Sequence, residues 1–231
     1  METGVTEEQI IDQYLEHLKA KEFPCVAARA ALSLNQVDCM VADHMACPKD
    51  DAAIVRFLYG FIEKYRAAET NFHSAAIIFR GPEIPGESMF DALLWQRLQA
   101  LSNIDATQFP YDARVSADPA SSSFSFSIGE EGFYIIGLHP QSSRKARRFP
   151  YPVLVFNLHA QFEELRASGQ YDRMKKTVRK RDLDYSGSVN PMLDDFGASS
   201  EVFQYSGRQY DAGWECPLKI NHATTPNNSA S

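Results

Sequence analysis

Two apolar runs that each end in a histidine constrain this chain more than any other feature. Residues 133–138 lead into His139, and residues 153–158 lead into His159. Apolar runs of this length, bounded by turn residues, are typical of buried strands. The loop that joins them carries Arg144, Arg147 and Arg148. The sequence therefore predicts two core strands with imidazoles at their carboxyl ends and a cationic loop beside them.

Imidazoles and guanidinium groups in this arrangement indicate a bound ligand. Soluble chains rarely place both at the ends of core strands unless something is held there. A planar, anionic, metal-containing ligand such as haem fits, because its iron takes histidine and its propionates take arginine. The alternative is that each histidine only caps a strand and that the arginines form a solvated loop.

Composition predicts one soluble domain. The chain has 231 residues, of which 44% are hydrophobic and 12% aromatic, enough to bury a sizeable core. We expect a single domain over residues 1–220 and a flexible tail over residues 221–231. The net charge of −7 argues against nucleic acid as a partner. No apolar run approaches the roughly 20 residues that a membrane helix needs, so no membrane association is expected.

The first residues and the cysteines predict a cytoplasmic protein. Residues 1–11 are acidic and polar, unlike a secretory signal. The chain has no CxxC spacing and no regular disulfide framework, which favours reduced thiols. The four cysteines are Cys25, Cys39, Cys47 and Cys216.

Apolar periodicity predicts an α+β fold: a small, mainly antiparallel sheet of about four strands covered by helices. Helical patterns occupy residues 7–18, 25–32, 51–65, 87–101 and 160–181, the last with a break near Gly169. Strand patterns occupy residues 74–79, 122–128, 133–138 and 153–156. Gly129 to Gly132 forms a tight connection, so the second and third strands should pair as a hairpin.

Other polar residues extend the candidate site. Cys25 follows Phe-Pro and opens a helix, where it is either a thiolate ligand or, as its small apolar neighbours favour, an inert packed thiol. Residues 190–208 mix carboxylates, amides and phenols, which are typical of a polar pocket and also of an irregular surface loop. GxSxG, P-loop, GxGxxG and HExxH motifs are absent from the sequence, which excludes the commonest hydrolase, nucleotide and zinc-protease sites.

Several segments form a pattern that runs in order over most of the chain, from residue 23 to residue 217. The segments are Phe-Pro-Cys at 23–25, Gly-Leu-His-Pro at 137–140, Ser-Arg-Lys-Ala-Arg-Arg-Phe at 143–149, Asn-Leu-His-Ala-Gln-Phe-Glu at 157–163, Arg-Asp at 181–182, Asn-Pro-Met-Leu-Asp-Asp-Phe-Gly at 190–197 and Ser-Glu-Val-Phe-Gln-Tyr-Ser-Gly-Arg at 200–208. Together they resemble one known family, the YqcI/YcgG family.

The resemblance implies an oxidoreductase. Members with a known activity are haem-dependent N-hydroxylases of guanidino groups, such as the arginine hydroxylase of D-cycloserine biosynthesis and the pre-guanitoxin N-hydroxylase. It implies haem b as cofactor and dioxygen or peroxide as co-substrate. A monooxygenase of this kind would hydroxylate a guanidine nitrogen of arginine or a related compound. The chain has no flavin motif and no ferredoxin-like cysteine cluster, so an external electron donor is expected. A homodimer is one candidate oligomeric state.

Residue chemistry then distributes the roles. His139 is the predicted axial iron ligand and His159 the runner-up, with the other histidine assisting proton delivery. His159 and Glu163 are the predicted catalytic residues, and the three arginines would neutralise the propionates. A buried guanidinium needs a carboxylate partner, for which Glu201 is the first candidate. The remaining candidates for substrate binding are Asp195, Tyr205 and Arg208. Alternatives of another class are a non-catalytic haem-binding or sensing protein and a structural protein without cofactor.

Overall fold

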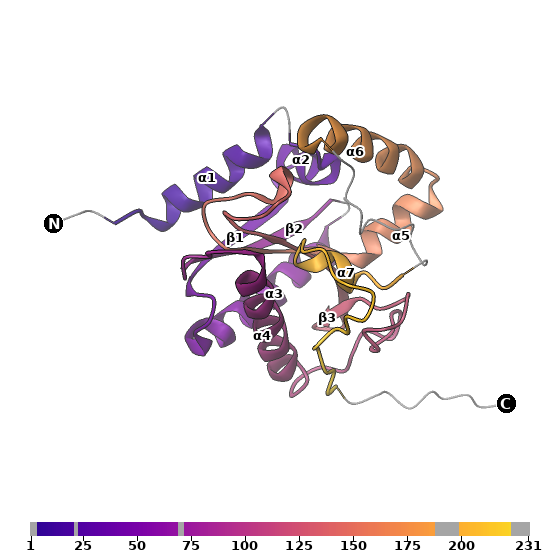
Figure 1. Ribbon diagram of the computed structural model, residues 1–231. Coiled ribbons are helices and arrows are strands. Elements are labelled where there is room, and N and C mark those ends of the chain that lie inside the picture. The colour runs from indigo at the N-terminus through magenta and orange to yellow at the C-terminus, as the bar shows by residue number, and fades with distance from the viewer. Residues whose placement is uncertain (1–3, 21–22, 69–71, 188–198, 223–231) are drawn as a thin grey trace.

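The computed structural model describes residues 4–20, 23–68, 72–187 and 199–222. Over these residues the chain is an α+β single domain in which seven α-helices surround one five-stranded sheet (Figure 1). The α-helices are α1 (Glu7–Lys19), α2 (Val26–Ser33), α3 (Asp51–Ala67), α4 (Glu87–Asp105), α5 (His159–Ala167), α6 (Tyr171–Ser186) and α7 (Val202–Tyr205). Short 3-10 helices are η1 (Pro48–Asp50) and η2 (Lys145–Arg147). The strands are β1 (Val37–His44), β2 (Ser74–Gly81), β3 (Phe126–Ile128), β4 (Glu131–Leu138) and β5 (Val153–Leu158).

The sheet has the order β1-β2-β5-β4-β3 and is mostly antiparallel, which confirms the predicted fold class. The exception is β1, which pairs with β2 in parallel through the α3 crossover. Strand β1 was not predicted. Its sequence Val-Asp-Cys-Met-Val-Ala-Asp-His mixes charged and apolar residues, and it lies half-buried at the sheet edge.

The predicted hairpin joins β3 to β4. Gly129 and Glu130 both have positive φ values, +58° and +62°, as expected for a type I′ two-residue turn. The first strand is shorter than predicted, however, because pairing begins only at Phe126. The break predicted near Gly169 is also present, since that residue adopts φ +68° between α5 and α6.

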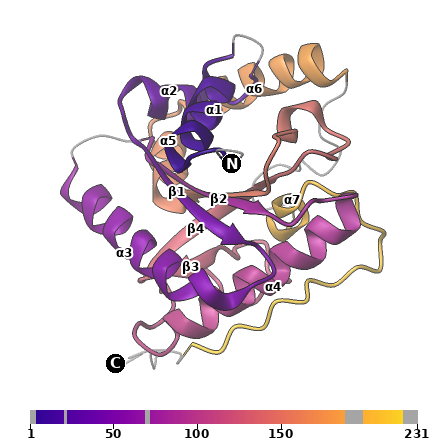
Figure 2. The same cartoon turned by 90° about the vertical axis from the view of Figure 1, so that its left-hand side faces the viewer.

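Helices cover both faces of the sheet (Figure 2). On one face α3 and α4 pack against a core that includes Phe79, Phe133 and Phe156. On the other face α1 packs against a smaller core with Ile78, Leu138 and Val155. Alternate residues of each strand thus enter different cores, as the two-residue period of a strand requires. The second face is where a cavity opens.

The outer edge of β4 beyond the short strand β3 is closed by α7 and by Arg147. The Arg147 guanidinium donates through Nη1 to the Tyr205 carbonyl at 3.0 Å and to the Gly137 carbonyl at 3.4 Å. Gly137 allows this close approach, because a Cβ there would lie 2.5 Å from the Phe90 ring and 3.0 Å from the Tyr205 oxygen. The same contacts fix the position of α7 beside β4.

The first two residues of the predicted tail, Asn221 and His222, make hydrogen bonds to the end of α4. His222 is buried, and its Nε2 lies 2.9 Å from Asp105 Oδ2, at the end of α4. Asn221 also donates to the Asn103 side chain at 3.1 Å. Residues 223–231 lie outside the described part of the chain.

Candidate functional site

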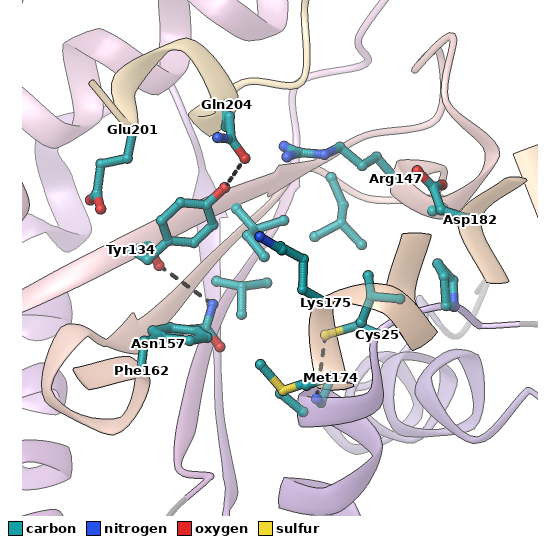
Figure 3. Close-up of a pocket in the computed structure, with 18 of the residues that line it drawn as sticks. Cys25, Tyr134, Arg147, Asn157, Phe162, Met174, Lys175, Asp182, Glu201 and Gln204 are labelled. Carbon is teal, nitrogen blue, oxygen red and sulfur yellow. Dashed lines mark hydrogen bonds between the residues drawn. The ribbon is translucent and has the colours of Figure 1, made fainter. Parts of the chain in front are cut away.

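A cavity of about 290 Å³ lies between the β4–β5 half of the sheet and helices α1, α2, α5 and α6 (Figure 3). Its volume is close to the lower end of the range for small-molecule sites, about 300–1,000 Å³. Segments from the whole length of the chain contribute to its wall. They include the start of α2, the loop with η2, both central strands, three C-terminal helices and the residues around α7.

The sheet supplies a mostly apolar wall. Antiparallel pairing sets Tyr134 opposite Asn157 and Ile136 opposite Val155, so these four side chains face the cavity together. Leu138 continues the row. Tyr134 donates its hydroxyl hydrogen to the Gln204 side chain, and the Asn157 amide donates to the Tyr134 carbonyl at 3.4 Å. The wall is therefore apolar in its middle and polar at one end.

Glu201 faces the cavity at this polar end. Its carboxyl group receives a hydrogen bond from the Tyr205 hydroxyl. Burial raises the pKa of Glu201 from 4.5 to about 8, although Tyr205, Ser125 and Arg166 act in the opposite direction. At neutral pH this carboxyl group is mainly protonated.

Positive charge gathers on the opposite side of the cavity. Arg144 Nη2 lies 2.5 Å from Asp182 Oδ2, and both side chains are about nine-tenths buried. Arg147 and Lys175 also line this side, while Arg166 lines the cavity from α5. The described lining thus contains four cationic side chains against two carboxylates, Asp182 and Glu201.

His159 lines the cavity at the start of α5. Its Nδ1 lies 2.9 Å from the Ser125 hydroxyl, and its Nε2 lies 3.0 Å from Glu163 Oε1. Burial lowers the pKa of His159, although Glu163 opposes the shift, so the ring is neutral at physiological pH. Both ring nitrogens are engaged, and neither offers a lone pair to the cavity. The predicted pairing of His159 with Glu163 is present.

His139 lies outside the cavity. It is 1% exposed and stacks on the Phe90 ring of α4, with ring centroids 4.4 Å apart. Neither ring nitrogen has a hydrogen-bond partner among the described residues. Burial lowers its pKa to about 4.

The structure does not bring the two predicted histidines together, and the expectation that they share one ligand does not hold. Because β4 and β5 are antiparallel, their carboxyl ends lie at opposite ends of the strand pair. In the register of Leu138 with Val153, His159 falls opposite Gly132, about 24 Å along the strand from His139 at ~3.4 Å per residue. The two imidazoles also belong to opposite faces of the sheet.

The other predicted residues divide between the cavity and its supports. Arg144, Arg147 and Glu201 line the cavity, whereas Tyr205 is fully buried behind Glu201. Arg148 instead donates to the Ser142 carbonyl at 2.6 Å and does not line the cavity. Arg208 is similarly displaced, because its Nη1 lies 3.5 Å from Asp91 of α4. Asp195 lies outside the described residues.

Cys25 lines the cavity, although its sequence neighbours favoured an inert packed thiol. It caps α2, with Sγ accepting a hydrogen bond from the Ala28 amide at 3.4 Å, and it lines the cavity. The small neighbours that favoured an inert thiol are the residues that let α2 approach the sheet. Tyr134 and Asn157 were also missed, because single residues inside strand patterns carry no local signal, whereas Gln204 belongs to the 190–208 segment that was predicted to line a polar pocket. Among the described residues, no cluster of three or more metal-ligating side chains is present.

The fold and site together define a class: an α+β protein with one mixed sheet and a cavity, apolar and cationic, on one of its faces. No helix in the described ranges is long and apolar enough to cross a bilayer. The chain belongs to the YqcI/YcgG family, whose model matches residues 14–219.

Two relatives from Bacillus subtilis (strain 168) support this assignment. The uncharacterized protein YqcI is 29% identical over 192 residues, which cover 80% of this chain and 74% of YqcI. The uncharacterized protein YcgG is 26% identical over 187 residues, which cover 77% of this chain and 72% of YcgG. No solved structure matches the chain.

Proposed function

We propose that the protein is a haem-dependent monooxygenase that N-hydroxylates a guanidino group of arginine or of an arginine-derived compound. The observation that carries the proposal is Glu201, a carboxyl group that lines a mostly apolar cavity and accepts a hydrogen bond from the Tyr205 hydroxyl. A carboxylate is costly to ionise there without a cation beside it. An incoming guanidinium supplies that cation. The resemblance to guanidine N-hydroxylases points to the same substrate class.

The lining of the cavity supports haem as the cofactor in this proposal. The apolar wall of Ile136, Leu138 and Val155 suits a porphyrin, and Arg144 and Arg147 would hold its propionates. Bound haem would supply the activation of dioxygen or peroxide. One oxygen atom enters the guanidine nitrogen and the other leaves as water. With dioxygen the reaction requires an external electron donor, whereas with peroxide it does not.

In this proposal Cys25, in place of His139 or His159, would hold the haem iron through its sulfur. A helix N-terminus favours a thiolate, and the Ala28 amide already donates to the sulfur. Burial raises the pKa of Cys25, so the free side chain is a thiol, but coordination to iron deprotonates it. His139 faces the other core, and both nitrogens of His159 are engaged.

The absorption spectrum of protein expressed with a haem precursor tests the cofactor. We expect a Soret band and, after reduction under carbon monoxide, the spectrum of a thiolate-ligated haem. Cys25→Ala should abolish haem binding or convert the spectrum, whereas Cys39→Ala should not. Cys39 is the matched control, because it packs near the same core without lining the cavity. Loss of the band in His159→Gln with Cys25→Ala unaffected would transfer the ligand role to the histidine.

Mass spectrometry of guanidino compounds tests the reaction. Arginine or agmatine incubated with the haem-loaded protein, air and a reductant should gain one oxygen atom. Glu201→Gln should lose most of this product while it keeps the Soret band, because the amide cannot neutralise a guanidinium. A haem-coloured protein with no product would instead be a haem-binding or sensing protein. A protein that takes up no haem contradicts the proposal.

A further inference from the structure

Helices α1, α2 and α6 form the outermost layer on the cavity side of the sheet, and α2 contacts both of the others (Figures 1 and 2). Their inner faces carry residues that wall the cavity, among them Tyr14 of α1, Ala28 of α2 and Val178 of α6. Each of the three helices therefore turns its opposite face to solvent. The side chains on these outer faces take no part in the site described above.

The outer face of α1 is acidic. Glu8 and Asp12 are exposed and lie four residues apart, so they share one face of the helix. No ion pair within the described residues neutralises either of them. Glu16 continues the stripe, but it is already paired with Lys19 at 2.5 Å. Like charges at this spacing disfavour an isolated helix, so the stripe does not serve the stability of α1.

The outer face of α6 is basic. Arg173, Lys176 and Lys180 are exposed, and their spacing of three and four residues places them on one face of the helix. None of the three makes an ion pair within the described part of the chain. Arg173 also lies in the first turn, where the helix dipole disfavours a cation. The chain as a whole has a net charge of −7, so its general composition does not explain a basic stripe.

The two stripes complement each other across α2. A single charged stripe is usually a solvated helix face. Here, however, stripes of opposite sign lie on one layer, on either side of α2 (Figure 1). A second copy, turned by 180° about an axis near α2, would bring its α1 to α6 and its α6 to α1. Each acidic stripe then meets a basic one, and both contacts are identical.

Exposed apolar side chains concentrate on the same layer. Among the described residues four large apolar side chains are exposed, and three of them belong to these helices or their ends. Val5 precedes α1 and is 42% exposed, Leu34 follows α2 and is 50% exposed, and Leu183 of α6 is 49% exposed. Leu183 lies three residues after Lys180, beside the basic stripe. Exposed ion pairs contribute little affinity, whereas burial of these side chains would add to it.

The layer is large enough for a reversible dimer. The helices have 13, 8 and 16 residues. At a rise of about 1.5 Å per residue and a width of about 10 Å, their outer faces offer roughly 600 Å² per copy. Two copies would bury roughly 1,200 Å² in total, which is the lower end of the range for specific interfaces.

We propose that the protein forms a two-fold dimer in which the acidic face of α1 in each copy docks on the basic face of α6 in the other. The partner is a second copy rather than an unrelated acidic protein, because the chain itself carries the complementary stripe on the same layer. The dimer does not rest on the proposed function, since neither haem nor arginine takes part. The second copy would cover the helical wall of the cavity from outside.

Sedimentation velocity of the purified full-length protein tests the dimer. At low salt we expect a dissociation constant of about 1–100 µM, in keeping with an interface of this size. Dissociation should increase near 1 M salt, where charges are screened beyond about 3 Å. Lys176→Glu with Lys180→Glu should raise the dissociation constant at least about tenfold, because like charges then face each other. Glu8→Lys with Asp12→Lys should have the same effect.

A mixture of the two charge-reversed proteins is the decisive sample. In a mixed dimer both contacts again join opposite charges, so the mixture should dimerise about as tightly as the wild type although neither protein does so alone. Lys49→Glu with Arg56→Glu is the matched control. Both residues are exposed, in η1 and α3 on the other side of the sheet, and their reversal changes the net charge by the same amount. The control should keep the wild-type dissociation constant.

Three results would overturn the dimer. They are a wild-type protein that stays monomeric at about 100 µM, a dimer that neither reversal weakens, and a mixture that stays monomeric. A monomeric wild type would leave the basic face of α6 to an acidic partner from outside. None of these measurements needs haem or arginine, so failure of the proposed function is seen separately in the spectrum and product assays.

Discussion

The fold surrounds two carboxyl groups, the buried Asp112 and the cavity-lining Glu201, with opposite kinds of partner. Asp112 accepts from Arg114 Nε and Nη2 at 2.8 Å each and from the Gly132 amide at 2.8 Å. Burial alone would raise its pKa, but these donors together lower it below its ordinary value. Glu201 accepts from the Tyr205 hydroxyl, and burial raises its pKa to about 8.

The difference between them is a guanidinium group supplied by the protein itself. Asp112 has Arg114 two residues away, so it is ionised and structural. Burial also disfavours the ionised form of Glu201, and Arg166 offsets only part of this effect. A carboxyl group that the fold leaves protonated in a cavity can be stabilised by a cation from outside. The comparison therefore separates a structural acid from a binding acid on physical grounds.

The largest expected effect is on stability at Asp112. Asp112→Ala should lower the free energy of unfolding by about 2–4 kcal/mol, because it leaves the buried Gly132 amide without its acceptor and removes a charge-assisted pair. Thermal or denaturant unfolding measures the loss. Asp118→Ala is the control: Asp118 accepts from the Ala120 amide at 3.0 Å but is exposed, and its removal should cost under about 1 kcal/mol. Equal losses of unfolding free energy in the two variants would show that Asp112 contributes no more to stability than an exposed carboxylate does.

Glu201→Gln should change how stability depends on pH. In the wild type the folded pKa of about 8 lies above the ordinary 4.5, so the folded state holds a proton that the unfolded state has lost. Its contribution is fully present below pH 4.5 and is lost as pH rises through 8. The free energy of unfolding of the glutamine variant should lack this decrease. Relative to the wild type, the variant should therefore become more stable as the pH rises from acid to alkaline. Denaturant midpoints across that range test the sign; parallel curves would mean that Glu201 is ionised throughout.

A smaller change is expected when Arg114 is removed. Arg114→Met should raise the Asp112 pKa and lower the free energy of unfolding at neutral pH by about 1 kcal/mol, a modest value because the arginine side chain is 56% exposed. The stability that Asp112 contributes is lost as pH falls through its folded pKa, so the acid limb should shift to higher pH. Lys64→Met, which removes a surface pair with Asp38 at 3.0 Å, should change stability by less than about 0.5 kcal/mol.

Local patterns were sufficient for most of the fold and for part of the site. The hairpin at Gly129, the helices and the central strands follow from periodicity and turn residues within a few positions. Strand β1 was missed because it pairs with β2, from which it is separated in the sequence by the 17-residue helix α3. The site depends on the direction and register of strand pairing. Because β4 and β5 are antiparallel, the histidines that follow them lie at opposite ends of the pair. The position of Cys25 against the sheet likewise depends on how α2 packs, which no local pattern indicates.

The smallest expected effect on stability is that of replacing His139, and His159 provides the comparison. His139→Phe should change the free energy of unfolding at neutral pH by less than about 1 kcal/mol, because the ring stacks on Phe90 and its nitrogens have no partners among the described residues. Its contribution is present above the ordinary pKa of 6.5 and is lost as pH falls through about 4, so the variant should gain on the wild type in acid. His159→Phe removes two hydrogen bonds and should destabilise the protein more.

If haem binds between β4–β5 and α2, His139→Phe must also keep the Soret band. A colourless His139→Phe protein of normal stability would place the iron on the Phe90 side of the sheet and exclude Cys25 as its ligand.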